Sequence, residues 1–288
     1  MACLRGVAAV VAALTVMTLS GCSRWIDAFV YQPRRSPGTT PGTVGMVYEE
    51  VRFPAADGVE LHGWWIPGTG SANPVVVLFH GNAGNLSDRV DLLRRLHDRL
   101  GVALFAFDYR GYGLSSGRPS DRGLLEDARG VRALAAARGW DRRGLVLFGR
   151  SLGAAVALAS AAEDPPAGLV LEAPFTSLED MARLHYPLLS WPFRRRLAGR
   201  WDNLERIRRV RSPVLFLHGD QDRVVPIGMG WRLYDACEAP KAFRTVTGAG
   251  HDDPAFVGGE AYWEAWRRFL ERLSAGPGLD NSESGGRL

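Results

Sequence analysis

The sequence predicts an α/β fold with a mostly parallel central sheet and helices on both of its faces. Between residues 44 and 275, short apolar runs of strand length alternate with longer runs that have helical spacing, and this alternation is typical of βαβ units. Most of the short runs are continuously apolar, which indicates strands buried on both faces. The chain of 288 residues, 46% of them hydrophobic, can form one such domain with a sizeable core.

Eight strands and five helices are expected along the chain. Residues 44–53 and 59–66 flank a turn at Ala56-Asp57-Gly58 and are expected at an edge of the sheet. The other strands are expected at residues 74–79, 102–107, 144–148, 169–171, 214–217 and 242–246, and the helices at residues 86–100, 121–138, 152–158, 228–237 and 260–273. Ligands bind beyond the carboxyl ends of strands in such sheets, so functional residues are sought in the turns that follow them.

The turn after residues 144–148 reads Gly149-Arg150-Ser151-Leu152-Gly153. A serine at a sharp strand-to-helix turn has a strained backbone and an exposed hydroxyl, and the two glycines let strand and helix approach without a Cβ clash. Ser151 is therefore the candidate nucleophile. The N–H of Leu152 lies at the helix start, where unpaired amides favour developing negative charge, as an oxyanion hole requires.

Two later turns supply an acid and a histidine. Asp220 and Asp222 follow the strand at residues 214–217, and His251 follows the final strand. A neutral imidazole at His251 can take the proton of Ser151, and an aspartate on the other ring nitrogen would fix its tautomer. From the residues alone, either aspartate can be this acid.

These motifs together resemble the α/β-hydrolase superfamily, and most of all its Bem46 and ABHD13/ABHD17-like branch. The resemblance covers about residues 44–273 and rests on the serine turn, His218-Gly219-Asp220-Gln221-Asp222, Val225-Pro226, Gly250-His251, Asp108-Tyr109-Arg110-Gly111-Tyr112-Gly113 and His80-Gly81-Asn82-Ala83-Gly84-Asn85. It implies the α/β-hydrolase fold and a triad of Ser151, Asp222 and His251. It also implies that the backbone N–H of Asn82 completes the oxyanion hole with that of Leu152.

Residues 175–211 interrupt the alternation of strands and helices and are expected to form a small cap. Nine arginines lie between residues 183 and 211, against Asp202 and Glu205. Two interpretations stay open. The cap can seat an anionic or acyl substrate or lie on lipid headgroups, or it is a solvated face of a protein that is rich in arginine throughout.

The first residues have the pattern of an export signal. Residues 7–19 carry no charge and are too few to span a bilayer. Leu19-Ser20-Gly21-Cys22 resembles a bacterial lipobox, which implies a signal peptide at residues 1–21, lipid on Cys22 and a location in the bacterial cell envelope, facing the periplasm or the exterior. An ordinary secretory peptide is the alternative. Residues 22–43 are expected to be a flexible tether and residues 276–288 a disordered tail.

The composition argues against disulfides, a metal site and nucleic-acid binding. Only Cys237 remains after the signal peptide and Cys22, so no intrachain disulfide is expected. We expect no metal, because no Cys/His cluster has ligand spacing, and no cofactor. The net charge of +4 comes from arginines spread along the chain, and we expect no nucleic-acid partner.

The sequence therefore predicts a serine hydrolase that cleaves an ester or thioester of a small or lipid-like acyl substrate through an acyl-enzyme. A serine at position 151 excludes the branches of the fold that need a carboxylate nucleophile there. Two alternatives are kept, a peptidase or amidase of the same fold and a catalytically silent interaction module attached to the membrane.

Overall fold

The structure is a computed structural model that describes residues 27, 30–36, 38–69, 74–140, 144–187 and 195–275. Among these residues, eight strands form one sheet in the order β1-β2-β4-β3-β5-β6-β7-β8. The strands are β1 (Glu49–Pro54), β2 (Glu60–Ile66), β3 (Val75–Phe79), β4 (Ala103–Asp108), β5 (Leu145–Arg150), β6 (Gly168–Glu172), β7 (Val214–Gly219) and β8 (Lys241–Val246). Strand β2 is antiparallel to β1 and β4, and the others run parallel, as predicted.

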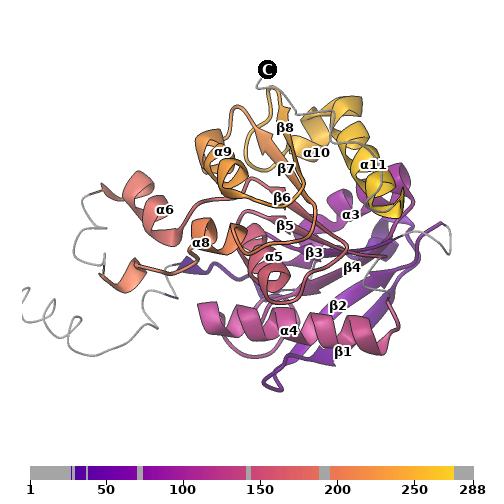
Figure 1. Cartoon of the computed structure of the whole chain (residues 1–288). Helices are drawn as coiled ribbons and strands as arrows, with labels where there is room; N and C mark the ends of the chain where they lie inside the picture. Colours follow the sequence, from indigo (N-terminus) through magenta and orange to yellow (C-terminus); the bar gives the residue numbers. More distant parts are fainter. Residues whose placement is uncertain are drawn as a thin grey trace, which may run out of the picture.

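Helices cover both faces of the sheet (Figure 1). On one face lie α4 (Asp121–Ala137), α5 (Leu152–Glu163), α8 (Asn203–Ile207) and α9 (Ile227–Ala236), and on the other lie α3 (Val90–Leu100), α10 (Pro254–Val257) and α11 (Gly259–Ala275). The 3-10 helices η1 (Pro41–Val44) and η2 (Leu86–Arg89) lie in loops. The three-layer arrangement confirms the predicted fold class.

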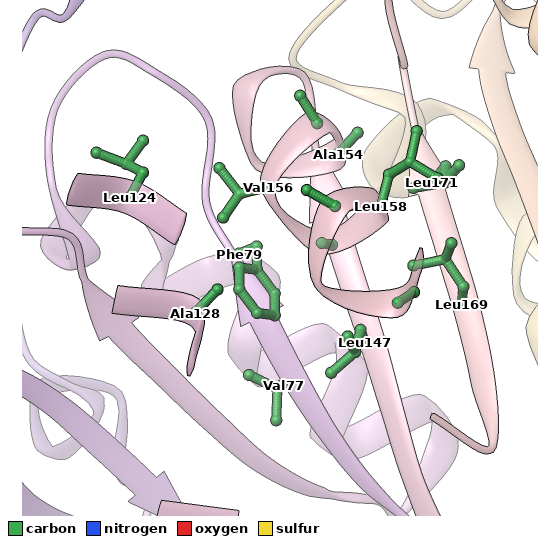
Figure 2. Packing of buried hydrophobic residues seen from close by; sticks show 14 of the residues in the cluster. Val77, Phe79, Leu124, Ala128, Leu147, Ala154, Val156, Leu158, Leu169 and Leu171 are labelled. Carbon is green, nitrogen blue, oxygen red and sulfur yellow. The ribbon is translucent and has the colours of Figure 1, made fainter. Parts of the chain in front are cut away.

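The core that positions the candidate nucleophile surrounds α5 (Figure 2). This helix is built almost entirely of small apolar residues, and ten of its twelve residues are buried. Side chains of α5 pack on Val77, Phe79, Leu147, Leu169 and Leu171 of the sheet. Burial of this kind contributes about 25 cal/mol per Å² of apolar surface. The start of α5, and with it the serine turn, is therefore held by a buried helix that packs on the sheet.

The beginning of the domain differs from its prediction in two ways. Residues 44–48 were expected in the first strand, but the chain forms η1 and then turns at Gly45, whose φ of 77° ends the helix, so β1 begins at Glu49. Residues 30–36 and 38–43 were expected within a flexible tether. Instead, residue 31 is buried and several of the others hydrogen-bond to the domain, so for them the tether prediction is wrong.

The insertion between β6 and β7 contains α6 (Leu178–His185) and α8. Helix α6 has no buried residue and stands out from the body of the molecule (Figure 1), whereas α8 buries Asn203 and Ile207. His185 Nε2 lies 2.8 Å from the carbonyl oxygen of Val224, in the turn that carries Asp222. That this insertion acts as a cap stays a prediction.

The predicted signal peptide, Cys22 and the C-terminal tail lie outside the described residues. Within the described part of the chain, no helix combines the length and the apolar character that crossing a bilayer requires.

Candidate active site

Ser151 lies at the junction of β5 and α5 with φ 53° and ψ −115°, a conformation that L-residues rarely adopt. Its N–H donates to the carbonyl oxygen of Glu172 on β6 at 2.9 Å, which anchors the turn to the sheet. A Cβ on Gly153 would collide with the carbonyl oxygen of Phe79, and one on Gly149 with that of Gly153. The sequence expectation of a strained serine between two obligatory glycines therefore matches the observed turn.

Asp222 and His251 are in direct contact. Nδ1 of His251 lies 2.8 Å from Oδ2 of Asp222, while Oδ1 accepts hydrogen bonds from the N–H groups of Val224 and Val225, both at 2.8 Å. Burial alone would favour the neutral acid, but hydrogen bonds from His218 and His251 together hold the pKa of Asp222 well below its usual range. The carboxylate stays charged, so His251 Nδ1 carries a proton and Nε2 is its basic nitrogen.

Asp220, the other acid that the sequence allowed, has a different partner. Its Oδ1 accepts a hydrogen bond from the N–H of Gly248 at 2.8 Å. A Cβ on Gly219 would collide with the carbonyl oxygen of Ala249, so the turns after β7 and β8 lie against each other. Asp220 therefore joins these turns, and of the two aspartates Asp222 contacts His251.

The serine and the histidine are not hydrogen-bonded to each other. Ser151 is partly exposed, and its hydroxyl has no hydrogen-bond partner among the residues that the structure describes. Among the described residues, His251 makes a side-chain hydrogen bond only through Nδ1, to Asp222. Their turns are nevertheless joined, because Arg150 Nη2 donates to the carbonyl oxygen of Asp252 at 3.0 Å. Catalytic hydrogen bonds are often long or misaligned before a substrate binds.

The two expected oxyanion donors also lie at this edge of the sheet. Leu152 is the first residue of α5, so its N–H has no acceptor within the helix. Asn82 lies in the loop after β3. A Cβ on its neighbour Gly81 would lie 3.8 Å from Cβ of Ser151, so this loop contacts the serine turn. Among the described residues, the N–H of Asn82 has no backbone acceptor.

A buried ion pair behind Ser151 was missed by the sequence analysis. Arg150 Nε lies 2.5 Å from Oε1 of Glu172, and the hydroxyl of Tyr262 donates to Oε2 of Glu172 at 2.6 Å. Arg150 and Glu172 are register partners on β5 and β6. The sequence held one sign of this pair, because two successive apolar strands end in an arginine and in a glutamate, which carry opposite charges.

Other polar residues here support loops. His80 is fully buried and its Nδ1 contacts the carbonyl oxygen of Gly81 at 2.7 Å, while Asp108 Oδ1 accepts from the N–H of Leu86 at 3.0 Å. His218 Nε2 contacts the carbonyl oxygen of Val225 at 2.8 Å. These contacts brace the loops that follow β3 and β7. Within the described ranges, no group of three or more His, Cys, Asp or Glu residues could hold a metal.

A mostly parallel sheet that places a serine, an aspartate and a histidine in this chain order at its carboxyl edge defines the class of α/β hydrolases. Comparison with known proteins agrees. The family described as "Serine aminopeptidase, S33" matches residues 70–203. The Pyrococcus furiosus esterase Pf2001 has the same fold, with a TM-score of 0.70 over 84% of this chain and 98% of that chain at 22% identity.

Curated relatives extend over nearly the whole chain. An uncharacterized protein of Mycobacterium tuberculosis, Rv2307c, is 40% identical, with 90% of this chain and 94% of the relative covered. Bem46 of Schizosaccharomyces pombe is 31% identical with 90% of each covered, and the chicken lysophosphatidylserine lipase ABHD12 is 35% identical over 63% of this chain and 52% of the lipase. The chain belongs to the α/β-hydrolase superfamily, with Bem46 among its relatives.

Proposed function

We propose that the protein is a serine hydrolase that cleaves carboxylic esters or thioesters through an acyl-enzyme. The observation that carries the proposal is the hydrogen bond between Asp222 and His251 beside a strained serine turn, because such a pair leaves a basic nitrogen for proton transfer. The esterase Pf2001 and the lipase ABHD12 give further support. The substrate class that we propose is an ester or thioester with a small or lipid-like acyl group.

The reaction divides into two steps. Ser151 Oγ attacks the carbonyl carbon as its proton passes to His251 Nε2, and the carbonyl electrons move to the oxygen, which faces the N–H groups of Leu152 and Asn82. The carbon–oxygen or carbon–sulfur bond then breaks, and His251 protonates the leaving alcohol or thiol. Water, deprotonated by His251, releases the acid from Ser151 in the same way.

Substitution of Ser151 tests the proposal. Wild type, Ser151→Ala and the exposed-residue control Ser116→Ala are assayed with p-nitrophenyl esters of increasing chain length and with acyl thioesters, and are labelled with a fluorophosphonate. Wild type and the control should hydrolyse esters and be labelled, whereas Ser151→Ala should lose at least about a thousandfold in kcat and all labelling. Equal labelling of Ser151→Ala would remove this residue from the nucleophile role.

A peptidase is the second candidate, because the matching family is described as a serine aminopeptidase. Amides need a poorer leaving group to be expelled, so the two functions differ in relative rate. The ester hydrolase should show a higher kcat/KM for a p-nitrophenyl ester of a short-chain fatty acid than for an aminoacyl p-nitroanilide. A ratio in the opposite direction would favour the peptidase.

We also infer that lipid on Cys22 attaches the protein to the cell envelope. Arg200 Nη2 contacts Oδ1 of Asp27 at 2.5 Å, and five residues span at most about 17 Å, so this lipid would keep the insertion close to the membrane. The expected result is that Cys22→Ser abolishes incorporation of labelled palmitate into the full chain. Undiminished incorporation would exclude Cys22 as the lipidated residue.

A further inference from the structure

The side chain of Asn82 is engaged by two other parts of the chain. Its Nδ2 donates to the carbonyl oxygen of Val30 at 2.6 Å, and its Oδ1 accepts from the N–H of Gln32 at 3.2 Å and from the hydroxyl of Tyr112 at 2.9 Å. Burial raises the pKa of Tyr112, so its hydroxyl keeps the proton that it donates. Three hydrogen bonds fix the plane of the amide, and the backbone of Asn82 is fixed with it.

Residues 30–36, named here the N-terminal strap, continue along the same loop. Pro33 and Gly84 form a parallel β-bridge, and the N–H of Arg34 donates to the carbonyl oxygen of Gly84 at 3.1 Å. Asn85 Nδ2 donates to the carbonyl oxygens of Arg34 at 3.0 Å and Ser36 at 2.8 Å. The strap therefore lies against the loop after β3 like a short additional strand.

The strap is also fastened at its beginning. Tyr31 is only 2% exposed. Its hydroxyl donates to Oδ1 of Asp121, at the start of α4, at 2.5 Å and accepts from Nε1 of Trp201, in the insertion, at 3.1 Å. Asn82 is thus connected through the strap to the start of α4 and to the insertion.

The loop needs such support, because Asn82 lies between Gly81 and Gly84, and Gly84 has φ 83°. Glycine backbones have a wide conformational range, whereas an oxyanion donor acts only if it is in place before charge develops. We infer that the strap and Tyr112 hold Asn82 so that its N–H faces the oxyanion. Asn82 is a positioning residue through its side chain, and this inference rests on the proposed hydrolase function.

A single backbone substitution tests the inference in the full chain. Gln32→Pro removes the N–H that donates to Asn82, and Gln32→Ala keeps it and serves as the matched control. Tyr112→Phe removes the second donor to Asn82 Oδ1. Because an oxyanion donor acts in the transition state, Gln32→Pro and Tyr112→Phe should each lower kcat for a p-nitrophenyl ester about tenfold, the worth of one hydrogen bond, with KM changed less than twofold.

Fluorophosphonate labelling of Ser151 gives a second readout, since its tetrahedral adduct also places an oxygen in the oxyanion hole. The labelling rate should fall in parallel with kcat, while Gln32→Ala keeps both within twofold of wild type. The inference is overturned if wild type is active and labelled on Ser151 but Gln32→Pro and Tyr112→Phe match it, or if they change KM alone. Failure of the hydrolase proposal looks different, because Ser151→Ala would then match wild type. Should Gln32→Pro not fold, Tyr112→Phe decides.

Discussion

Arg150 and Glu172 form a buried ion pair directly behind the candidate nucleophile, with Arg150 also holding the backbone beside His251. Removing one partner of such a pair leaves an uncompensated buried charge. Arg150→Met should therefore lower the free energy of unfolding by about 3–5 kcal/mol, measured by urea denaturation. The double variant Arg150→Met with Glu172→Gln should recover part of this loss. If the single variant is as stable as wild type, the pair makes no contribution to stability.

His80 is one residue through which pH should act on stability. Burial lowers its pKa to about 4 from the ordinary value of 6.5. Between these values the unfolded chain binds a proton that the folded chain does not, so the free energy of unfolding falls as pH drops from 6.5 to 4, by about 3 kcal/mol in total. His80→Gln should show a shallower pH dependence of urea unfolding over this range. An unchanged slope would mean that His80 also binds its proton in the folded state.

The serine turn depends on close contact between β3, β5 and α5. A Cβ on Gly153 would meet backbone atoms of Phe79 and His80, which cannot move aside without shifting β3. Gly153→Ala should therefore lower the free energy of unfolding by about 2–4 kcal/mol and reduce labelling of Ser151.

Gly228, in α9, is the matched control for this substitution. Nothing lies within 4 Å of a Cβ added there, and its backbone needs no left-handed conformation. Gly228→Ala should be neutral or stabilising by up to about 1 kcal/mol. If both alanine variants have the same melting temperature, close approach at Gly153 does not explain its identity.

The strands of this fold were predictable because each central one is a continuous apolar run that can only be buried, and the turns after them carry Ser151, Asp222 and His251 in chain order. The residues alone left both Asp220 and Asp222 open as the acid, and only the family resemblance favoured Asp222. In the structure, Asp222 contacts His251, whereas Asp220 accepts from the N–H of Gly248. The first strand was placed too early, because residues 44–48 have strand-like alternation, but Val44 still belongs to η1 and Gly45 turns the chain before β1 begins.

Contacts between residues far apart in the sequence could not be predicted from the pattern of any single segment. Residues 33–41 are rich in proline, glycine, serine and threonine, which is the composition of a linker. Their backbone groups nevertheless pair with a loop about 50 residues further along, and such pairing depends on backbone geometry that composition does not encode. The folded domain therefore begins earlier along the chain than the hydrophobic pattern suggests.

This difference makes a prediction for the whole molecule. Two chains without Cys22, one starting at residue 23 and one at residue 40, differ by the strap and the residues next to it. Loss of the strap removes the buried Tyr31 and the hydrogen bonds that the strap makes to Asp121, Trp201 and Asn82. Burial of one large side chain stabilises by about 1.5–3 kcal/mol and each of the three hydrogen bonds by about 1 kcal/mol, so the shorter chain should be less stable by roughly 5 kcal/mol and melt roughly 15 °C lower. A freely moving tether would contribute nothing, and equal melting temperatures of the two chains would show that the strap contacts do not stabilise the domain.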